Sequence, residues 1–168
     1  MVAMANDTTF NPSANLLRQS DFDMGNPSIT SPFEPGSVNK IVTATAAIHY
    51  NVAKPTEVFQ VPGQIQMDSV TVRDAWVHGV VPYTMTGIFG KSSNVGTLMI
   101  AQRVGKTRFA EMLRKFGLGH TTGIELAGES AGVVPALRQW QGGSFANLPI
   151  GQGLSLTLLQ MASMYQTI

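Results

Sequence analysis

A turn that leads directly into a helix is the feature that most restricts how this chain can fold. Residues 33–36 form the turn, because proline fixes one φ angle and glycine permits a tight reversal. Over residues 38–50, apolar side chains recur at helical spacing, at Val38, Ile41, Val42, Ala46 and Ile48. The pattern predicts a helix that begins next to Ser37, with Ser37 and Lys40 on one face.

Ser37 and Lys40 can together form a nucleophile and its base. A serine hydroxyl is a weak nucleophile until a base removes its proton, and a lysine amine serves as that base when its pKa is lowered. The N-terminus of the helix would also favour negative charge beside Ser37. A Ser-x-x-Lys sequence alone is weak support, since about one arises by chance in a chain of this length. A second polar group is therefore needed.

The second group is the sequence Ser92–Ser93–Asn94, set between the apolar stretches 83–89 and 95–104. The Ser92 hydroxyl could relay a proton, and the Asn94 amide could hold a substrate carbonyl. The alternative is a helix N-cap, where serine and asparagine are both favoured. Another Ser-x-Asn, at residues 13–15, lies in a polar stretch and is assigned no role.

Three sequences in this order resemble the transpeptidase domain of class B penicillin-binding proteins, and most closely the actinobacterial division-type enzyme. They are EPGSVNK at 34–40, KSSNVGT at 91–97 and PIGQGLSLT at 149–157, and the likeness covers nearly the whole chain. The family carries Ser-x-x-Lys, Ser-x-Asn and Lys-Thr/Ser-Gly motifs. The third is absent, because the only Lys-Thr, at 106–107, precedes Arg108. We expect residues 1–168 to be a partial transpeptidase domain, truncated at both ends.

The resemblance implies an α+β fold of the penicillin-binding protein and serine β-lactamase type, represented mainly by its helical part with about one strand of the sheet. It implies a peptidoglycan D,D-transpeptidase of cell division and cell shape. In that activity Ser37 is the nucleophile, Lys40 the general base, Ser92 the proton relay and Asn94 a substrate-binding residue, and β-lactams acylate Ser37. Without the third motif, we expect these residues by themselves to be inactive or nearly so.

Two kinds of alternative remain open. One is a D,D-carboxypeptidase or β-lactamase of the same fold, in which water is the acceptor. The other is a non-catalytic domain that binds β-lactams or acts as a sensor. A Gly-x-Ser-x-Gly sequence at 128–132 resembles a hydrolase elbow, but residues 131–168 contain no Asp, Glu or His to complete its triad.

The resemblance implies stem peptides and β-lactam antibiotics as ligands. Division proteins and a glycosyltransferase would be partners through regions outside these residues. It places the protein at the extracytoplasmic face of the bacterial cytoplasmic membrane, although the sequence shows neither an anchor nor a signal. It implies no cofactor, and the scattered histidines His49, His78 and His120 predict no metal site. A net charge of +1 without a basic cluster argues against nucleic acid binding.

The composition predicts faces that are covered by more protein. Charged residues make up 12%, against about 25% in ordinary soluble domains, so we expect an isolated polypeptide of these residues to be poorly stable. Trp76 is expected to anchor packing. The remaining expected elements are a strand at 1–5, a loop at 11–32, short strands or extended segments at 54–61 and 64–72, helices at 84–89, 94–104 and 106–116, a possible strand at 123–127, a loop at 133–152 and a final helix at 154–168.

Overall fold

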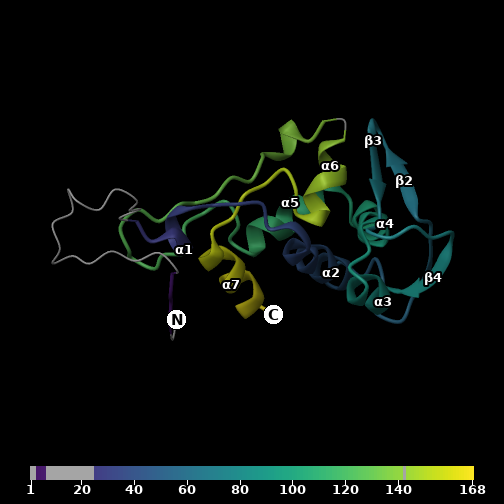
Figure 1. Ribbon diagram of the computed structural model, residues 1–168, viewed down its shortest axis with the longest axis horizontal. Helices are drawn as coiled ribbons and strands as arrows, with labels where there is room; N and C mark the ends of the chain where they lie inside the picture. The colour runs from purple at the N-terminus through teal and green to yellow at the C-terminus, as the bar shows by residue number, and fades with distance from the viewer. Residues whose placement is uncertain (1–2, 7–24, 142) are drawn as a thin grey trace.

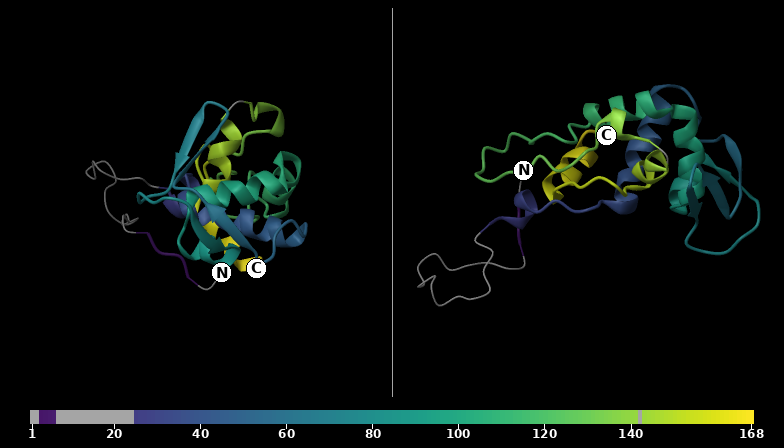
Figure 2. Two further views of the ribbon diagram at one scale, coloured as in Figure 1. Left: turned by 90° about the vertical axis from the view of Figure 1, so that its right-hand side faces the viewer. Right: turned by 90° about the horizontal axis from the view of Figure 1, so that it is seen from above.

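The computed structural model describes residues 3–6, 25–141 and 143–168. Helices form its centre, two small two-stranded β-sheets lie at one end, and α1 lies toward the other (Figure 1). The view from above keeps the sheets at the end opposite α1 (Figure 2). In chain order the elements are α1 (Pro27–Thr30), the 3₁₀ turn η2 (Gly36–Asn39), α2 (Lys40–His49), β1 (Val58–Val61), β2 (Gln64–Met67), β3 (Val70–Arg73), β4 (Val81–Thr84), α3 (Met85–Gly90), α4 (Asn94–Val104), α5 (Lys106–Lys115), η3 (Leu137–Gln139), α6 (Ser144–Asn147), η4 (Leu148–Ile150) and α7 (Leu158–Gln166).

The core is built where α2 packs against α4 and α5. Helix α2 contributes Val42 and Ala46 to this core, as its spacing predicted, but Val38 and Ile48 are 39% and 52% exposed. The apolar face was therefore predicted wrongly at its two ends. Val38 precedes the regular helix, which begins at Lys40, and the residues that the helix buries are Lys40, Val42, Thr43, Ala46 and Ala47.

The three following helices agree with their sequence patterns. Helices α3 and α4 are separated at Lys91–Ser93, and Ser93 caps α4 by accepting a hydrogen bond from the N–H of Gly96 at 2.8 Å. Helix α5 buries Phe109, Met112 and Leu113 on one side. It ends before Gly117, whose φ of +72° is readily accessible to glycine.

Two antiparallel pairs make up the described strands, β1 with β4 and β2 with β3. The expected short strands between residues 54 and 72 are confirmed, whereas β4 was missed. Its Pro82 pairs with Gln60 at an edge, where a residue without an N–H is tolerated. None of the helices within the described ranges is both long and apolar enough to cross a lipid bilayer.

Residues 133–152 are more ordered than the predicted loop. They contain η3, α6 and η4, and Trp140 and Phe145 stack at 5.8 Å while packing with Phe109 of α5. The last helix begins at Leu158 rather than at residue 154, because Ser155 and Leu156 pair in extended bridges with Val133 and Phe33.

Three other expectations are wrong where the structure describes the residues. Residues 3–5 form no strand, residues 123–127 form no strand, and the loop predicted at 11–32 contains the short helix α1. Residues 1–2 and 11–24 of those expectations lie outside the described residues. Trp76 is not a buried anchor: it is partly exposed and stacks on His78 with ring centroids 5.4 Å apart.

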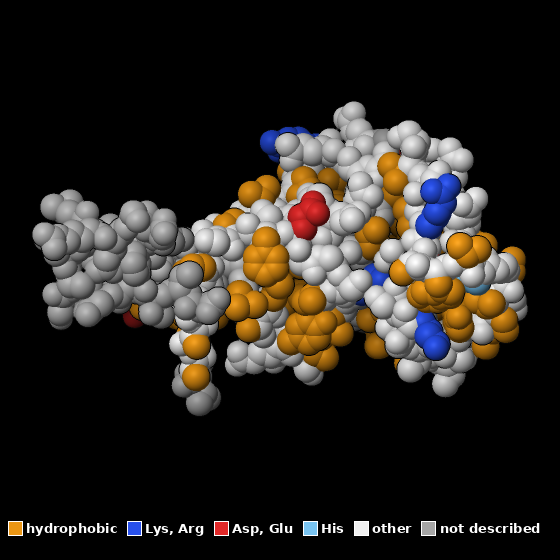
Figure 3. Space-filling view, viewed as in Figure 1, with side chains coloured by type: hydrophobic (Ala, Val, Ile, Leu, Met, Phe, Trp, Pro, Cys, Tyr) orange, Lys and Arg blue, Asp and Glu red, His pale blue; other side chains and the backbone are white. Residues whose placement is uncertain are grey.

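Hydrophobic side chains reach the surface over the end that carries the β-sheets and around α7 (Figure 3). The exposed apolar residues of these parts include Val58, Val77, Val80, Leu158 and Tyr165. This agrees with the low charge of the composition.

Candidate active site

Ser37 lies in the 3₁₀ turn η2, immediately before α2, and is exposed to solvent. The turn is held at Gly36, whose N–H donates to the carbonyl of Gly151 at 2.9 Å. Gly151 has a φ of +84°, and a Cβ at this position would lie 1.8 Å from the Gly36 oxygen. The contact therefore requires glycine at residue 151, and it fixes the backbone from which Ser37 projects.

The segment around η4 holds the same turn through two side chains. The Glu34 carboxylate accepts a hydrogen bond from the N–H of Gly153 at 2.8 Å. Asn39 is fully buried, and its side-chain amide donates to the Leu148 carbonyl at 2.9 Å. Ser37 is thus clamped between contacts on either side of it in the chain.

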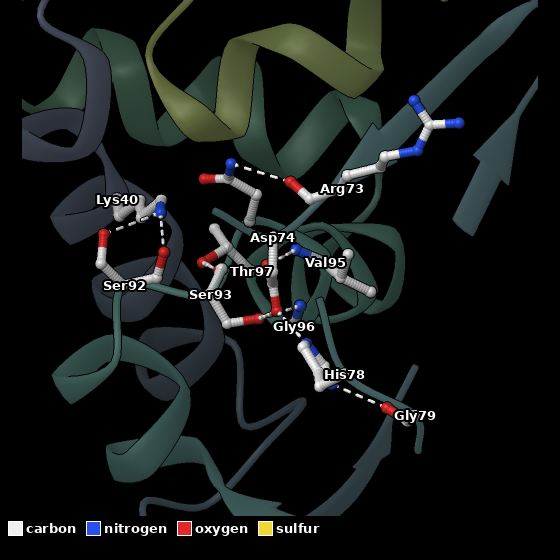
Figure 4. A network of polar contacts seen from close by, with 11 residues as sticks. Lys40, Arg73, Asp74, His78, Gly79, Ser92, Ser93, Val95, Gly96 and Thr97 are labelled. Carbon is white, nitrogen blue, oxygen red and sulfur yellow. Dashed lines mark hydrogen bonds and ion pairs between the residues drawn. The ribbon is translucent and has the colours of Figure 1, made fainter. Parts of the chain in front are cut away.

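Ser92 connects Ser37 to Lys40. The Ser92 hydroxyl donates to Ser37 Oγ at 3.1 Å, and Lys40 Nζ lies 3.0 Å from Ser92 Oγ and 2.6 Å from the Ser92 carbonyl oxygen. Figure 4 shows the two contacts of Lys40 with Ser92. The sequence predicted that Lys40 would reach Ser37 from the same helical face. In the structure the connection runs through the hydroxyl of Ser92.

Lys40 is 4% exposed. This burial lowers the pKa of its amine to about 8, against the opposing effect of the Asp74 carboxylate, which raises it. The ordinary value is 10.5, so a substantial fraction of the amine is neutral near physiological pH. A buried amine of this kind can accept a proton.

The Ser92 backbone has an unusual conformation for a residue with a side chain. Its φ is +55°, in the left-handed region. The N–H groups of Ser92 and Ser93 donate to the carbonyls of Phe89 and Ile88 at 3.0 and 2.9 Å. Helix capping, the alternative explanation for this motif, applies to Ser93, which leaves the Ser92 hydroxyl for Ser37 and Lys40.

Asn94 is the first residue of α4 and is partly exposed. Its side-chain amide donates to the carbonyl of Arg73 at 3.1 Å. The structure therefore brings Ser37, Lys40 and Ser92 into one hydrogen-bonded group and places Asn94 on the same turn as Ser92.

Sequence reasoning missed a buried carboxylate behind this group. Asp74 accepts hydrogen bonds from Ser93 Oγ at 2.8 Å and from the N–H of Val95 at 3.0 Å, and it pairs with His78 Nε2 at 3.0 Å. The four-residue spacing of Asp74 and His78 is the one sequence signal that could have found the pair. No cluster of metal-ligating side chains occurs among the residues that the structure describes.

The chain is similar to known proteins over nearly its whole length. Residues 1–168 match the family model of the penicillin binding protein transpeptidase domain. The chain is 68% identical over its whole length to penicillin-binding protein PbpB of Mycolicibacterium smegmatis, of which it covers 26%. It is 33% identical to the peptidoglycan D,D-transpeptidase FtsI of Escherichia coli, covering all of this chain and 28% of that protein. The crystal structure of penicillin binding protein 3 from Mycobacterium tuberculosis complexed with ampicillin has a TM-score of 0.92 and 66% identity, covering 95% of this chain and 35% of that one. The chain thus spans about a quarter of the length of its curated relatives.

Proposed function

The chain belongs to the penicillin-binding protein transpeptidase family, and we propose that the protein which carries it is a peptidoglycan D,D-transpeptidase acting through Ser37. Family membership confirms the predicted family and its α+β fold. The observation that carries the proposed activity is the line of hydrogen bonds from Ser37 through Ser92 to Lys40.

The first step is acylation of Ser37 by a stem peptide. Ser37 Oγ attacks the carbonyl carbon of the penultimate D-alanine, while its proton passes toward the neutral amine of Lys40. Since Ser92 Oγ is bonded to both groups, it can carry that proton. The peptide C–N bond then breaks, and the terminal D-alanine leaves as an amine that takes up a proton through Ser92.

The second step transfers the acyl group to another stem peptide. The amine of the acceptor attacks the ester carbonyl and gives up one proton through Ser92 and Lys40, the bond between the acyl carbon and Ser37 Oγ breaks, and the same proton is delivered to Ser37 Oγ. Asn94 holds the amide of the donor peptide. The carboxylate of the site network, Asp74, is buried and already bonded to three partners, which favours an amine acceptor over a water molecule activated by a carboxylate.

β-Lactams would acylate the same serine, and the ampicillin complex of the mycobacterial relative supports this. We further propose an extracytoplasmic location at the cytoplasmic membrane, with division proteins and a glycosyltransferase as partners of the intact protein. The naming of one relative as a peptidoglycan D,D-transpeptidase supports the cell-wall substrate.

The test is the intact mass of the protein after incubation with a penicillin. In the intact protein, wild type and Ser31→Ala, a matched change at another exposed serine, should each gain one drug molecule, and Ser37→Ala should gain none. The experiment is run on the 168-residue polypeptide and on the intact protein that carries it. An adduct on the intact protein alone means that the site needs further residues, whereas no adduct on either favours a non-catalytic domain.

The fate of the adduct separates the possible acceptors. A transpeptidase should keep the penicilloyl group for a long time and transfer a peptide acyl group to an added amino acceptor. Rapid loss of the adduct with hydrolysed penicillin as the product would instead indicate a β-lactamase.

A further inference from the structure

We propose that Asp74 is a positioning residue for acyl transfer, holding the turn at residues 92–95 so that Ser92 stays between Ser37 and Lys40. The inference rests on the proposed function and assigns a role to a residue outside the three family motifs. It starts from the position of the carboxylate, which lies behind the reacting group and is shielded from solvent: the Asp74 side chain is 0% exposed.

The backbone of Asp74 is anchored to the neighbouring strands. It follows β3 directly, and its N–H donates to the carbonyl of Gly63 at 3.2 Å. A Cβ on Gly63 would lie 2.2 Å from the carbonyl oxygen of His78. The segment that carries Asp74 and His78 therefore packs closely against the connection between β1 and β2, and the carboxylate projects from a fixed support.

The two oxygens of Asp74 bind residues immediately after Ser92. Oδ2 accepts the Ser93 hydroxyl, and Oδ1 accepts the N–H of Val95 in the first turn of α4 (Figure 4). A carboxylate that accepts two such bonds fixes both the side chain and the backbone of the turn. It also satisfies an N–H group at the start of α4, where helical N–H groups lack partners within the helix.

The turn needs such support because of the Ser92 conformation. A serine with φ of +55° lies in a sparsely populated region and relaxes unless its neighbours prevent this. Relaxation would rotate the Ser92 side chain away from Ser37 and would also move the Ser92 carbonyl, which lies 2.6 Å from Lys40 Nζ. The hydrogen bonds of Ser93 and Val95 to Asp74 therefore control both contacts of Lys40 with Ser92.

His78 in turn orients the carboxylate. Its Nε2 lies 3.0 Å from Asp74 Oδ2, its Nδ1 lies 2.7 Å from the Gly79 carbonyl, and its ring stacks on Trp76. The ring is thereby fixed on two sides, and it limits rotation of the Asp74 side chain.

The test compares substitutions of Asp74 in the intact protein. Asp74→Ala removes both acceptors, and Asp74→Asn keeps the shape, since its amide oxygen can accept from Val95 and its amide nitrogen can donate to Ser93 Oγ. Asp68→Asn, the same change on the exposed turn between β2 and β3, is the matched control. The acylation rate constant and the dissociation constant of the non-covalent penicillin complex are measured separately, beside the melting temperature.

A positioning role predicts that Asp74→Ala lowers the acylation rate constant about 10- to 100-fold with little change in the dissociation constant, by analogy with other groups that orient reactants. Asp74→Asn should recover most of this rate. It should also move the pH midpoint of acylation below that of wild type, because the Asp74 charge opposes the lowering of the Lys40 pKa by burial. Asp68→Asn should match wild type in every measurement.

Folded Asp74→Ala with the wild-type acylation rate constant would overturn the inference, whatever its melting temperature. If Asp74→Ala does not fold, Ser93→Ala replaces it, since that change removes one of the two anchors. An acylation rate constant at least about 5-fold below that of wild type then supports the positioning role of Asp74, and an unchanged rate constant refutes it. Failure of the wild-type protein to form an adduct would instead refute the proposed function.

Discussion

The acylation of Ser37 should depend on pH through the amine of Lys40. With a pKa of about 8, roughly 9% of the amine is neutral at pH 7, against roughly 0.03% at the ordinary lysine value. Burial therefore increases the supply of the basic form about 300-fold at pH 7. The rate constant should rise about tenfold per pH unit below pH 7, bend near pH 8 and reach a plateau above it, a total increase of about 100-fold from pH 6.

Two arginine substitutions isolate the contribution of Lys40. Lys40→Arg keeps a positive charge but cannot act as a base, since guanidinium stays protonated in proteins. Its acylation rate constant should fall by about 10²–10⁴, the usual range for a general base. Lys91→Arg makes the same change at the exposed residue that precedes Ser92 and should leave the rate constant unchanged.

The assay is stopped-flow acylation of the intact protein by a fluorescent penicillin between pH 5.5 and 9.5. Each point is corrected for spontaneous opening of the β-lactam. A rate that is flat across this range, or one that still rises tenfold per unit at pH 9.5, would refute the assignment of Lys40 as a base with a lowered pKa. An equal fall of the acylation rate constant in Lys40→Arg and Lys91→Arg would show that the substitution acts generally and not through the base at residue 40.

Two further predictions concern the support of Ser37. Gly151→Ala should lower the acylation rate constant more than tenfold, because its Cβ would lie 1.8 Å from the Gly36 carbonyl oxygen. Gly90→Ala, whose added Cβ has no atom within 4 Å, should leave the rate constant unchanged. Equal rate constants in the two variants would contradict the close packing. Asn39→Ala should lower the free energy of unfolding by about 0.5–1.5 kcal/mol in denaturant titration, because the Leu148 carbonyl loses one of its two N–H donors and keeps only that of Gly151. Unchanged stability would contradict the importance of this bond.

The sequence predicts α3, α4 and α5 well because the pattern that forms a helix is local. In α5, residues three and four apart face the same core, so its spacing alone predicts which side chains are buried. The strand β4 and the late start of α7 escaped prediction because they depend on partners far away in the chain. Leu156, for example, pairs with Phe33, which no local pattern reveals.

The residues of the candidate site likewise fall into those that local sequence patterns predict and those that depend on distant contacts. Ser37, Lys40, Ser92 and Asn94 were predicted because motifs preserve their spacing. Asp74 was not, because its partners lie about 20 residues later and the left-handed conformation of Ser92 cannot be inferred from residue type. The sequence also predicted a direct contact between Ser37 and Lys40, whereas Ser92 lies between them in the structure. Helical spacing describes only side chains on the same helix, and Ser92 belongs to another segment.

The contacts around Ser37 also determine when the site can form during synthesis. The turn that carries the nucleophile is closed by Gly151, Leu148 and Gly153, which lie more than a hundred residues later in the sequence. Closure of so long a loop is entropically unfavourable until the helices between have packed. At about 5–20 residues per second, a ribosome needs several seconds to make the intervening chain. The serine is therefore translated early but becomes organised as a nucleophile late, so a growing chain cannot be acylated efficiently before its helical core is complete.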